Sequence, residues 1–360
     1  MTWPSLPRTR PLSAADALAA LKDSRADGRL RFWFLLALPA PLALLAMAFG
    51  RYEISPGGVL QALGHALSGQ PATTAAETLV LQVRLPRILA ALLVGSALGG
   101  SGAAFQGIFK NPLVDSNILG VTSGAGFGAA LALLLTGSLP LASLAAFICG
   151  MAAVLLAHVG AQTRGGSHTL MLTLSGILVG SFFSALTSLV KILADPLSEL
   201  PAITFWLLGG LSDVTWRDLP LLALIVGLGS AFLIAIRWQL NVLSLGDREA
   251  AALGLDTRRM KLAVIGVSAL LTAAAVAVGG VIGWVGLVIP HAGRMLVGPD
   301  HRRLLPVTLS LGATFLLVID TLARTALPRE VPLGVFTGIV GVPVLFILLR
   351  KARTGAGWVE

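Results

Sequence analysis

Residues 240–261, LNVLSLGDREAAALGLDTRRMK, are a charged stretch between two long apolar runs, 218–236 and 260–280. An apolar run of about 20 residues is long enough to cross a bilayer as a helix. Charged side chains inside the hydrocarbon layer are costly, so the Asp, Glu and Arg residues of the stretch favour water. We therefore expect a water-exposed segment that joins two transmembrane helices.

The composition of the whole chain supports a membrane protein. Of 360 residues, 56% are hydrophobic and only 12% are charged, and the mean hydropathy is +0.87. A water-soluble chain of this length could not bury so much apolar surface. The 41 glycines are typical of closely packed transmembrane helices. The net charge of +9 does not indicate nucleic-acid binding, because loops on the cytoplasmic side of a membrane protein are rich in Lys and Arg.

The apolar pattern predicts an all-α integral membrane protein with ten transmembrane helices in one domain, residues 32–350. Glycines and Pro290 interrupt residues 276–298 and predict a broken helix there. The predicted crossings are residues 32–50, 86–106, 117–137, 140–161, 169–191, 218–236, 260–280, 281–298, 305–326 and 332–350.

The positive charges set the expected orientation. Ten crossings with the N-terminus inside place most of the 26 Lys and Arg residues on the cytoplasmic side. Residues 1–31 lack the apolar core of a signal peptide. We expect residues 1–31 and 351–360 to be cytoplasmic tails. On the outer side, residues 202–211 are too short to cross and predict an interfacial or re-entrant helix.

The charged stretch has its own helical signals. Residues 246–254 have acids in the first turn and a glycine at the expected stop, and Asp256 is placed to cap a following helix. Two short helices at an angle would form a rigid knob suited to a groove in a partner protein. A solvated loop is the alternative.

Four segments, in this order, resemble one family, the permease subunits of bacterial type II ABC importers that move iron siderophores, haem, cobalamin and, in some members, molybdate. The resemblance extends over nearly the whole chain from about residue 32. It rests on residues 84–95 (RLPRILAALLVG), 106–113 with 119–126 (QGIFKNPL, LGVTSGAG), 244–254 (SLGDREAAALG), and 283–291 with 298–306 (GWVGLVIPH, GPDHRRLLP).

This resemblance implies a homodimer with two ATPase subunits on the cytoplasmic side and one substrate-binding protein outside. In the family, the cytoplasmic knob sits in a cleft of the ATPase and couples ATP hydrolysis to movement of the membrane helices. A rigid element joined to two spans suits that task. The implied coupling residues are Gly246, Asp247, Glu249, Ala250, Leu253 and Gly254.

Three arginines lie at predicted outer helix ends, Arg84, Arg87 and Arg324. The resemblance implies that they face acidic residues on the binding protein. The alternatives are snorkelling to the interface and, for Arg324, an ion pair with Asp320 at i, i+4.

The predicted cytoplasmic turn after the second span contains Asn111, Pro112 and Leu113. Pro112 disfavours helix at Asn111, which fixes a turn. The alternative is that this turn only connects two helices. The resemblance makes Asn111 and Leu113 candidate residues of a cytoplasmic gate.

The chain contains no GxxxxGK[ST] motif, so an ATPase subunit must supply hydrolysis, and we do not expect an enzyme. Cys149 is the single cysteine, and the histidines lack ligand spacing, so neither a metal nor a cofactor is expected. An ion-driven secondary transporter is the main rival. It would need ionisable groups near the middle of the membrane, whereas the charges lie at span ends. An intramembrane enzyme would need convergent polar groups that the sequence lacks.

The sequence does not determine the substrate. The expected order is an iron chelate (siderophore or haem), then cobalamin, then molybdate. The expected location is the bacterial cytoplasmic (inner) membrane.

Overall fold

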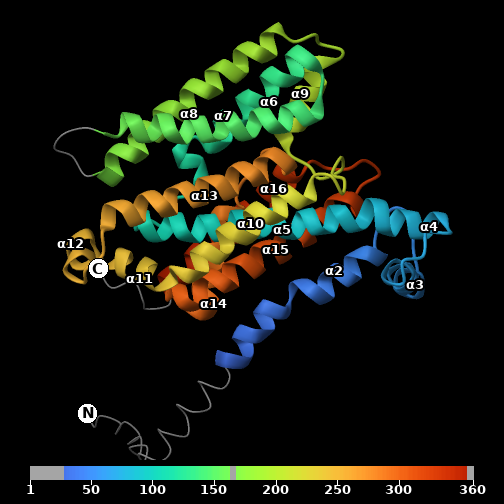
Figure 1. Cartoon of the computed structure of the whole chain (residues 1–360), viewed down its shortest axis with the longest axis horizontal. Coiled ribbons are helices and arrows are strands. Elements are labelled where there is room, and N and C mark those ends of the chain that lie inside the picture. The colour runs from blue at the N-terminus through green and yellow to red at the C-terminus, as the bar shows by residue number, and fades with distance from the viewer. Residues whose placement is uncertain (1–27, 163–167, 355–360) are drawn as a thin grey trace, which may run out of the picture.

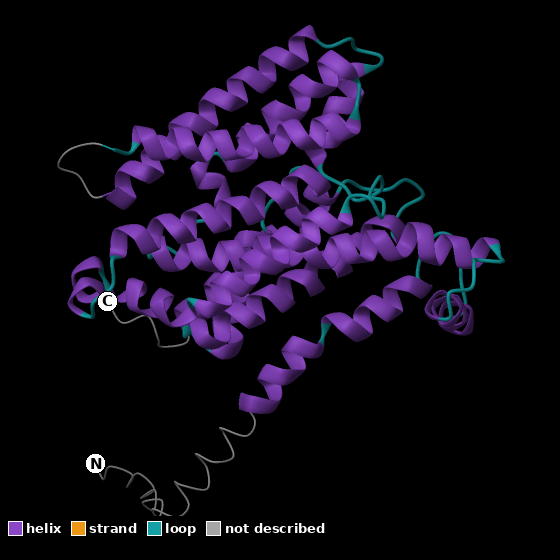
Figure 2. Cartoon of the chain, viewed as in Figure 1, coloured by secondary structure: helices purple, strands orange, loops and turns teal. Residues whose placement is uncertain are grey.

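The computed structural model describes residues 28–162 and 168–354, and within these ranges the chain is helical without any β-strand (Figure 2). Most of the predicted tails, 1–31 and 351–360, lies outside the described residues. The first helical span begins by residue 28 and α16 (Leu333–Thr354) continues past residue 350, so both terminal spans extend beyond their predicted limits.

Within the described ranges, seven helices are long and apolar enough to cross a membrane, so the chain is a multi-pass membrane protein. An eighth candidate is the pair α10 (Leu219–Ala235) and α11 (Arg237–Leu245), which is bent by 57°. The seven are residues 28–48, which include α2 (Pro39–Ala48); residues 75–109, made of α4 (Ala75–Thr78), η1 (Leu79–Arg84) and α5 (Leu85–Phe109); and α7 (Leu139–Gly160), α8 (His168–Leu193), α13 (Thr257–Gly279), α15 (His301–Thr325) and α16.

Two predicted crossings correspond to shorter helices. After η2 (Ser116–Leu119), α6 (Val121–Thr136) has 16 residues, and α14 (Val285–Val297) has 13. The Gly-rich residues 280–284 are not helical, and Trp284 has a φ of 71°, so 281–298 is not one continuous crossing helix. The break predicted within 276–298 is therefore present, and helix length alone does not confirm the count of ten.

Helix α5 occupies the centre of the molecule, with α10, α13, α14 and α15 packed around it and a second layer of α6, α7, α8 and α9 (Glu199–Leu208) on the side of α13 (Figure 1). Glycines allow these contacts. A Cβ added to Gly95 of α5 would lie 2.2 Å from the Gly312 oxygen of α15. A Cβ on Gly102 would lie 2.2 Å from the Gly286 oxygen of α14. Such close backbone approach stabilises helix pairs where water cannot drive association.

The two ends of the bundle differ (Figure 1). One end carries α11 and the short helix α12 (Asp247–Ala252), and we call it the α12 end. The opposite end carries α3 (Pro56–Leu67) and α4, and we call it the α3 end. Helix α9, with 10 residues, is too short to cross, as the sequence predicted for this region.

Candidate functional site

The predicted knob forms one short helix, not two. Helix α12 starts after Gly246 and stops before Gly254, whose φ of 82° is a left-handed conformation that favours glycine. The Asp256 carboxylate accepts the backbone N–H of Arg259 at 3.0 Å and caps α13. Because no proline interrupts the next turns, α13 runs for 23 residues from Thr257 into the bundle. The prediction of a separate second short helix is therefore wrong.

Helix α12 is fixed on its inner side and exposed on its outer side. The Lys261 ammonium of α13 lies 2.6 Å from a carboxylate oxygen of Asp247, and the Lys261 side chain is only 8% exposed. Ala250 is fully buried. Leu253 is 57% exposed and Glu249 is also exposed. The helix is thus a rigid element that presents a free surface at the end of the bundle.

The preceding helix α11 is tied to α15 by an amide that sequence reasoning missed. The Asn241 side-chain oxygen accepts the backbone N–H of His301 at 2.8 Å, and its Nδ2 donates to Asp300 at 2.5 Å. Asp300 also caps the start of α15 by accepting the Arg302 N–H at 2.9 Å. These bonds connect α11, the helix before α12, to the start of α15 in the membrane bundle. The motif at 298–306 was the available signal, but it gives no partner for Asn241.

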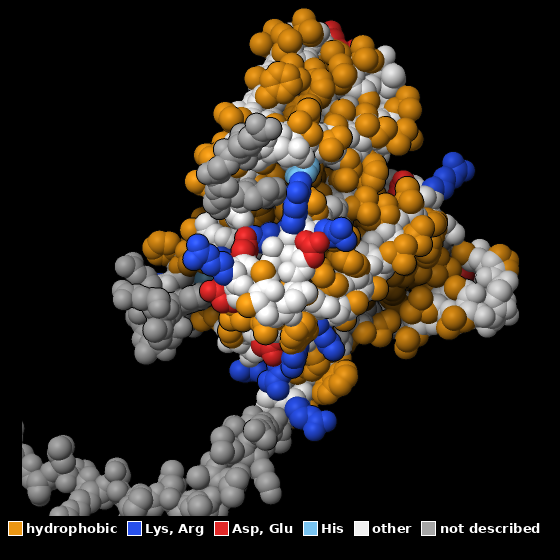
Figure 3. All heavy atoms as spheres, turned by 60° about the vertical axis from the view of Figure 1, so that its left-hand side comes forward, with side chains coloured by type: hydrophobic (Ala, Val, Ile, Leu, Met, Phe, Trp, Pro, Cys, Tyr) orange, Lys and Arg blue, Asp and Glu red, His pale blue; other side chains and the backbone are white. Residues whose placement is uncertain are grey.

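Lys and Arg side chains, with acids between them, gather over this end of the molecule (Figure 3). The exposed basic residues of the elements here include Lys110, Arg237, Arg248, Arg258, Arg259, Arg302 and Arg303. The same end carries the turn after α5. There the Asn111 side-chain oxygen accepts the Leu113 N–H at 2.9 Å, and the Leu113 side chain is 55% exposed.

Asp115 lies just beyond this turn and is buried, and burial raises the pKa of its carboxyl. It accepts two hydrogen bonds from Asn117, at 3.0 Å from the backbone N–H and 2.7 Å from Nδ2. The turn is therefore held by local side-chain bonds. A gating role for Asn111 and Leu113 stays a prediction.

The three candidate docking arginines lie close to one another at the α3 end, and all three are buried. The Arg84 guanidinium donates to the carbonyls of Met47 at 2.5 Å, Ala48 at 3.2 Å and Tyr52. Arg324 Nη2 donates to the Ala46 carbonyl at 2.6 Å. These two arginines thus satisfy the carbonyls that a helix leaves unpaired at its C-terminus, here the end of α2.

Arg87 binds two carboxylates. Its Nη2 lies 2.8 Å from Asp320 Oδ1, and its Nη1 lies 3.0 Å from Glu330 Oε1. Asp320 is also 3.7 Å from Arg324 Nε, which is the i, i+4 pair predicted as the alternative. The partners of Arg87 are 233 and 243 residues away in sequence, and no local pattern could have found them.

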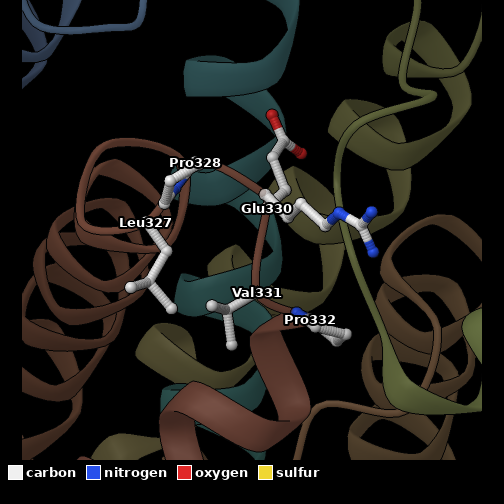
Figure 4. Close-up of a pocket in the computed structure, with 6 residues that line it drawn as sticks. Leu327, Pro328, Glu330, Val331 and Pro332 are labelled. Carbon is white, nitrogen blue, oxygen red and sulfur yellow. The ribbon is translucent and has the colours of Figure 1, made fainter.

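A cavity of about 1020 Å³ opens beside this network at the α3 end. A smaller hollow of about 440 Å³ surrounds the connection 327–332, where the Glu330 side chain extends away from Val331 and Pro332 (Figure 4). The larger cavity is lined by Arg87 and Glu330, by aromatic rings and by rim charges, among them Phe205, Trp206, Asp213, Trp216, Arg217 and Asp218.

The fold is that of a polytopic membrane protein with a short charged helix at one end. The chain belongs to the FecCD transport family, whose profile matches residues 35–351, and it is a permease subunit of an ABC importer. The match covers nearly all of the described residues.

Individual relatives extend this result. The chain is 40% identical over 316 residues to the molybdate import system permease protein MolB of Haemophilus influenzae, and the match covers 87% of this chain and 93% of that protein. It is 40% identical over 289 residues to the cobalamin import system permease protein BtuC of Halobacterium salinarum, covering 80% and 77%. Other relatives are named for iron chelatin, iron hydroxamate and hemin.

A solved structure shows the same fold. It is an inward-facing conformation of a transporter assigned to the metal-chelate type. The TM-score is 0.80 at 38% sequence identity, and the match covers 89% of this chain and 98% of the other.

Proposed function

We propose that the chain forms, with a second copy of itself, the translocation pathway of an importer for an iron chelate, a siderophore or haem. A substrate-binding protein docks at the α3 end, and two ATPase subunits dock at the α12 end and hydrolyse ATP. The chain lies in the bacterial cytoplasmic membrane with both termini inside. It crosses ten times if α6, α14 and the bent pair α10–α11 are each counted as one crossing.

The helix α12 is the observation that carries this proposal. Its Asp247 pair with Lys261 and the buried Ala250 hold it against the bundle, while Glu249 and Leu253 offer a surface to a partner. A short helix held this firmly transmits a push from a docked subunit to α13 instead of bending. Gly246 and Gly254 set its two ends. The proposed coupling site consists of Gly246, Asp247, Glu249, Ala250, Leu253 and Gly254.

The basic surface in Figure 3 supports a cytoplasmic α12 end, because Lys and Arg accumulate on that side of membrane proteins. The turn at Asn111 and Leu113 then lies at the inner mouth, where we propose that it helps to close the pathway. Docking of a binding protein then takes place at the α3 end, at the surface around Arg84, Arg87 and Arg324.

The homodimer is supported by uncovered apolar helices. Only 17% of the apolar window of α8 and 22% of that of α16 are buried within one chain. These two helices would face lipid or the second copy. A second copy packed there would enclose a pathway between the subunits.

Exchange of a glycine in the coupling site tests the function. Gly254→Trp should abolish substrate-driven ATP hydrolysis while the complex still assembles in the membrane. No atom lies within 4 Å of the added Cβ, so the indole would project outward, and a left-handed non-Gly residue costs about 1–2 kcal/mol. Gly69→Trp is the matched control. Gly69 has a similar φ of 69°, has open space around it, and lies at the α3 end.

The complex with Gly69→Trp should keep its substrate-driven ATP hydrolysis in reconstituted vesicles. Full activity of Gly254→Trp would remove the coupling assignment. Purification of the chain from membranes without any ATPase, together with uptake driven by an ion gradient, would instead favour the secondary transporter.

The substrate is tested on the partner binding protein. The metal-chelate assignment of the solved structure and the iron and hemin relatives support the iron chelate. The MolB and BtuC relatives keep molybdate and cobalamin as alternatives. We expect tight binding of a ferric siderophore or haem. Tight molybdate binding without a response to the chelates would reverse this assignment.

A further inference from the structure

The two carboxylates on Arg87 differ in their surroundings. Asp320 has no exposed surface, and it contacts Nε and Nη2 of the guanidinium. The Glu330 side chain is 37% exposed and contacts only Nη1, at 3.0 and 3.2 Å. One partner is therefore part of the core, and the other lies at the surface.

Arg84 and Arg324 have no such surface partner. Their hydrogen bonds go to the carbonyls at the end of α2 and, for Arg84, also to the Tyr52 carbonyl beyond it. The ion pair of Arg324 goes to the buried Asp320. Pulling either guanidinium away would leave helix-end carbonyls or a buried charge without a partner, which is strongly destabilising. Only Arg87 can change one partner and keep a buried one.

The location of Glu330 also allows its carboxylate to leave Arg87 and another carboxylate to take its place. It lies in the exposed connection between α15 and α16, and its carboxylate extends from that connection toward α5 (Figure 4). Arg87 and Glu330 both line the cavity of about 1020 Å³ that opens at the α3 end. A side chain entering from outside would reach Arg87 Nη1 without displacing a helix.

We propose that Glu330 occupies, within the free permease, the position that a carboxylate of the substrate-binding protein takes on docking. The partner's carboxylate pairs with Arg87 Nη1, and Glu330 moves into water. This inference rests on the proposed function, because it needs a binding protein at the α3 end. The geometry of the guanidinium fits a carboxylate, since Nη1 already donates to both Glu330 oxygens while Nε and Nη2 stay with Asp320.

Such an exchange avoids the main cost of docking onto a buried arginine. Arg87 is paired before and after, so no buried charge is left uncompensated at either stage. Glu330 regains hydration when released. The strength of docking is then set by competition, and Glu330 weakens the affinity for the binding protein.

The affinity of the full permease–ATPase complex in lipid nanodiscs for its own binding protein tests this competition. Glu330→Gln removes the competing charge and should tighten binding about fivefold, the upper range for ion pairs of this exposure. Glu330→Asp keeps the charge but is one methylene shorter, so it should also tighten binding. Asp213→Asn is the control. Asp213 lines the same cavity but does not contact Arg87, so its loss should change the affinity less than about twofold.

The outcomes separate the two proposals. Tighter binding by both Glu330 variants, with Asp213→Asn near wild type, supports the exchange. Unchanged or weaker binding by Glu330→Gln, or equal tightening by Asp213→Asn, overturns the exchange while docking itself stands. If the wild-type complex does not bind the binding protein at low salt, the proposed function fails instead.

Discussion

Asp320→Asn should destabilise the protein more than any other loss of one charge at the α3 end. Asp320 is completely buried and pairs with Arg87 at 2.8 Å and with Arg324 at 3.7 Å. The nearly isosteric amide leaves two buried arginines with one partly exposed carboxylate, Glu330. Breaking a buried ion pair from one side costs about 3–5 kcal/mol. At roughly 2 °C per kcal/mol for a large domain, Tm should fall by about 6–10 °C.

Cys149 offers a direct assay, because it is the only cysteine in the chain and is partly buried in α7. A dye that becomes fluorescent on reaction with a thiol will report unfolding in detergent as temperature rises. Glu330→Gln is the matched control, since it removes a carboxylate from the same arginine at a partly exposed position and should cost about 1 kcal/mol or less. Equal losses of Tm for Asp320→Asn and Glu330→Gln would refute the argument from burial.

Two further changes test the coupling segment and the central helix. Lys261→Met removes the ion-pair partner of Asp247 and should lower substrate-stimulated ATP hydrolysis severalfold in vesicles without loss of assembly. Arg259→Met breaks an exposed ion pair and should leave the rate of hydrolysis unchanged. Equal rates for both variants would count against a rigid α12. Gly102→Ala brings a methyl group to within 2.2 Å of the Gly286 oxygen and should cost about 1–3 kcal/mol, measured as Tm with the same thiol dye. An unchanged Tm would mean that α5 and α14 separate freely.

The sequence predicted most of the helices because their signals are local. Long apolar runs fixed the spans, and Gly254 and Asp256 marked the end of α12 and the start of α13 as the structure has them. The prediction failed at the join between the charged stretch and the crossing predicted at 260–280. Nothing interrupts the chain after Thr257, so α13 continues into the bundle instead of stopping as a second short helix.

The candidate site divides in the same way. Composition and motifs led to the coupling segment, the turn at Asn111 and the permease class. The resemblance also implied Arg84, Arg87 and Arg324 as docking groups; the structure buries all three and pairs Arg324 with Asp320, which was the alternative prediction. Exposure could not be predicted, because it depends on where α2 and α15 end relative to α5.

The sequence by itself determined a polytopic helical membrane protein, since hydrophobicity and helix signals act over a few residues or turns. Only the tertiary structure decided how the charges are used. Asp320 and Glu330 reach Arg87 across 233 and 243 residues because glycines let α5 and α15 pack backbone against backbone. An ion pair of that kind depends on distances of a few ångströms between distant segments, and only the packed bundle fixes such distances.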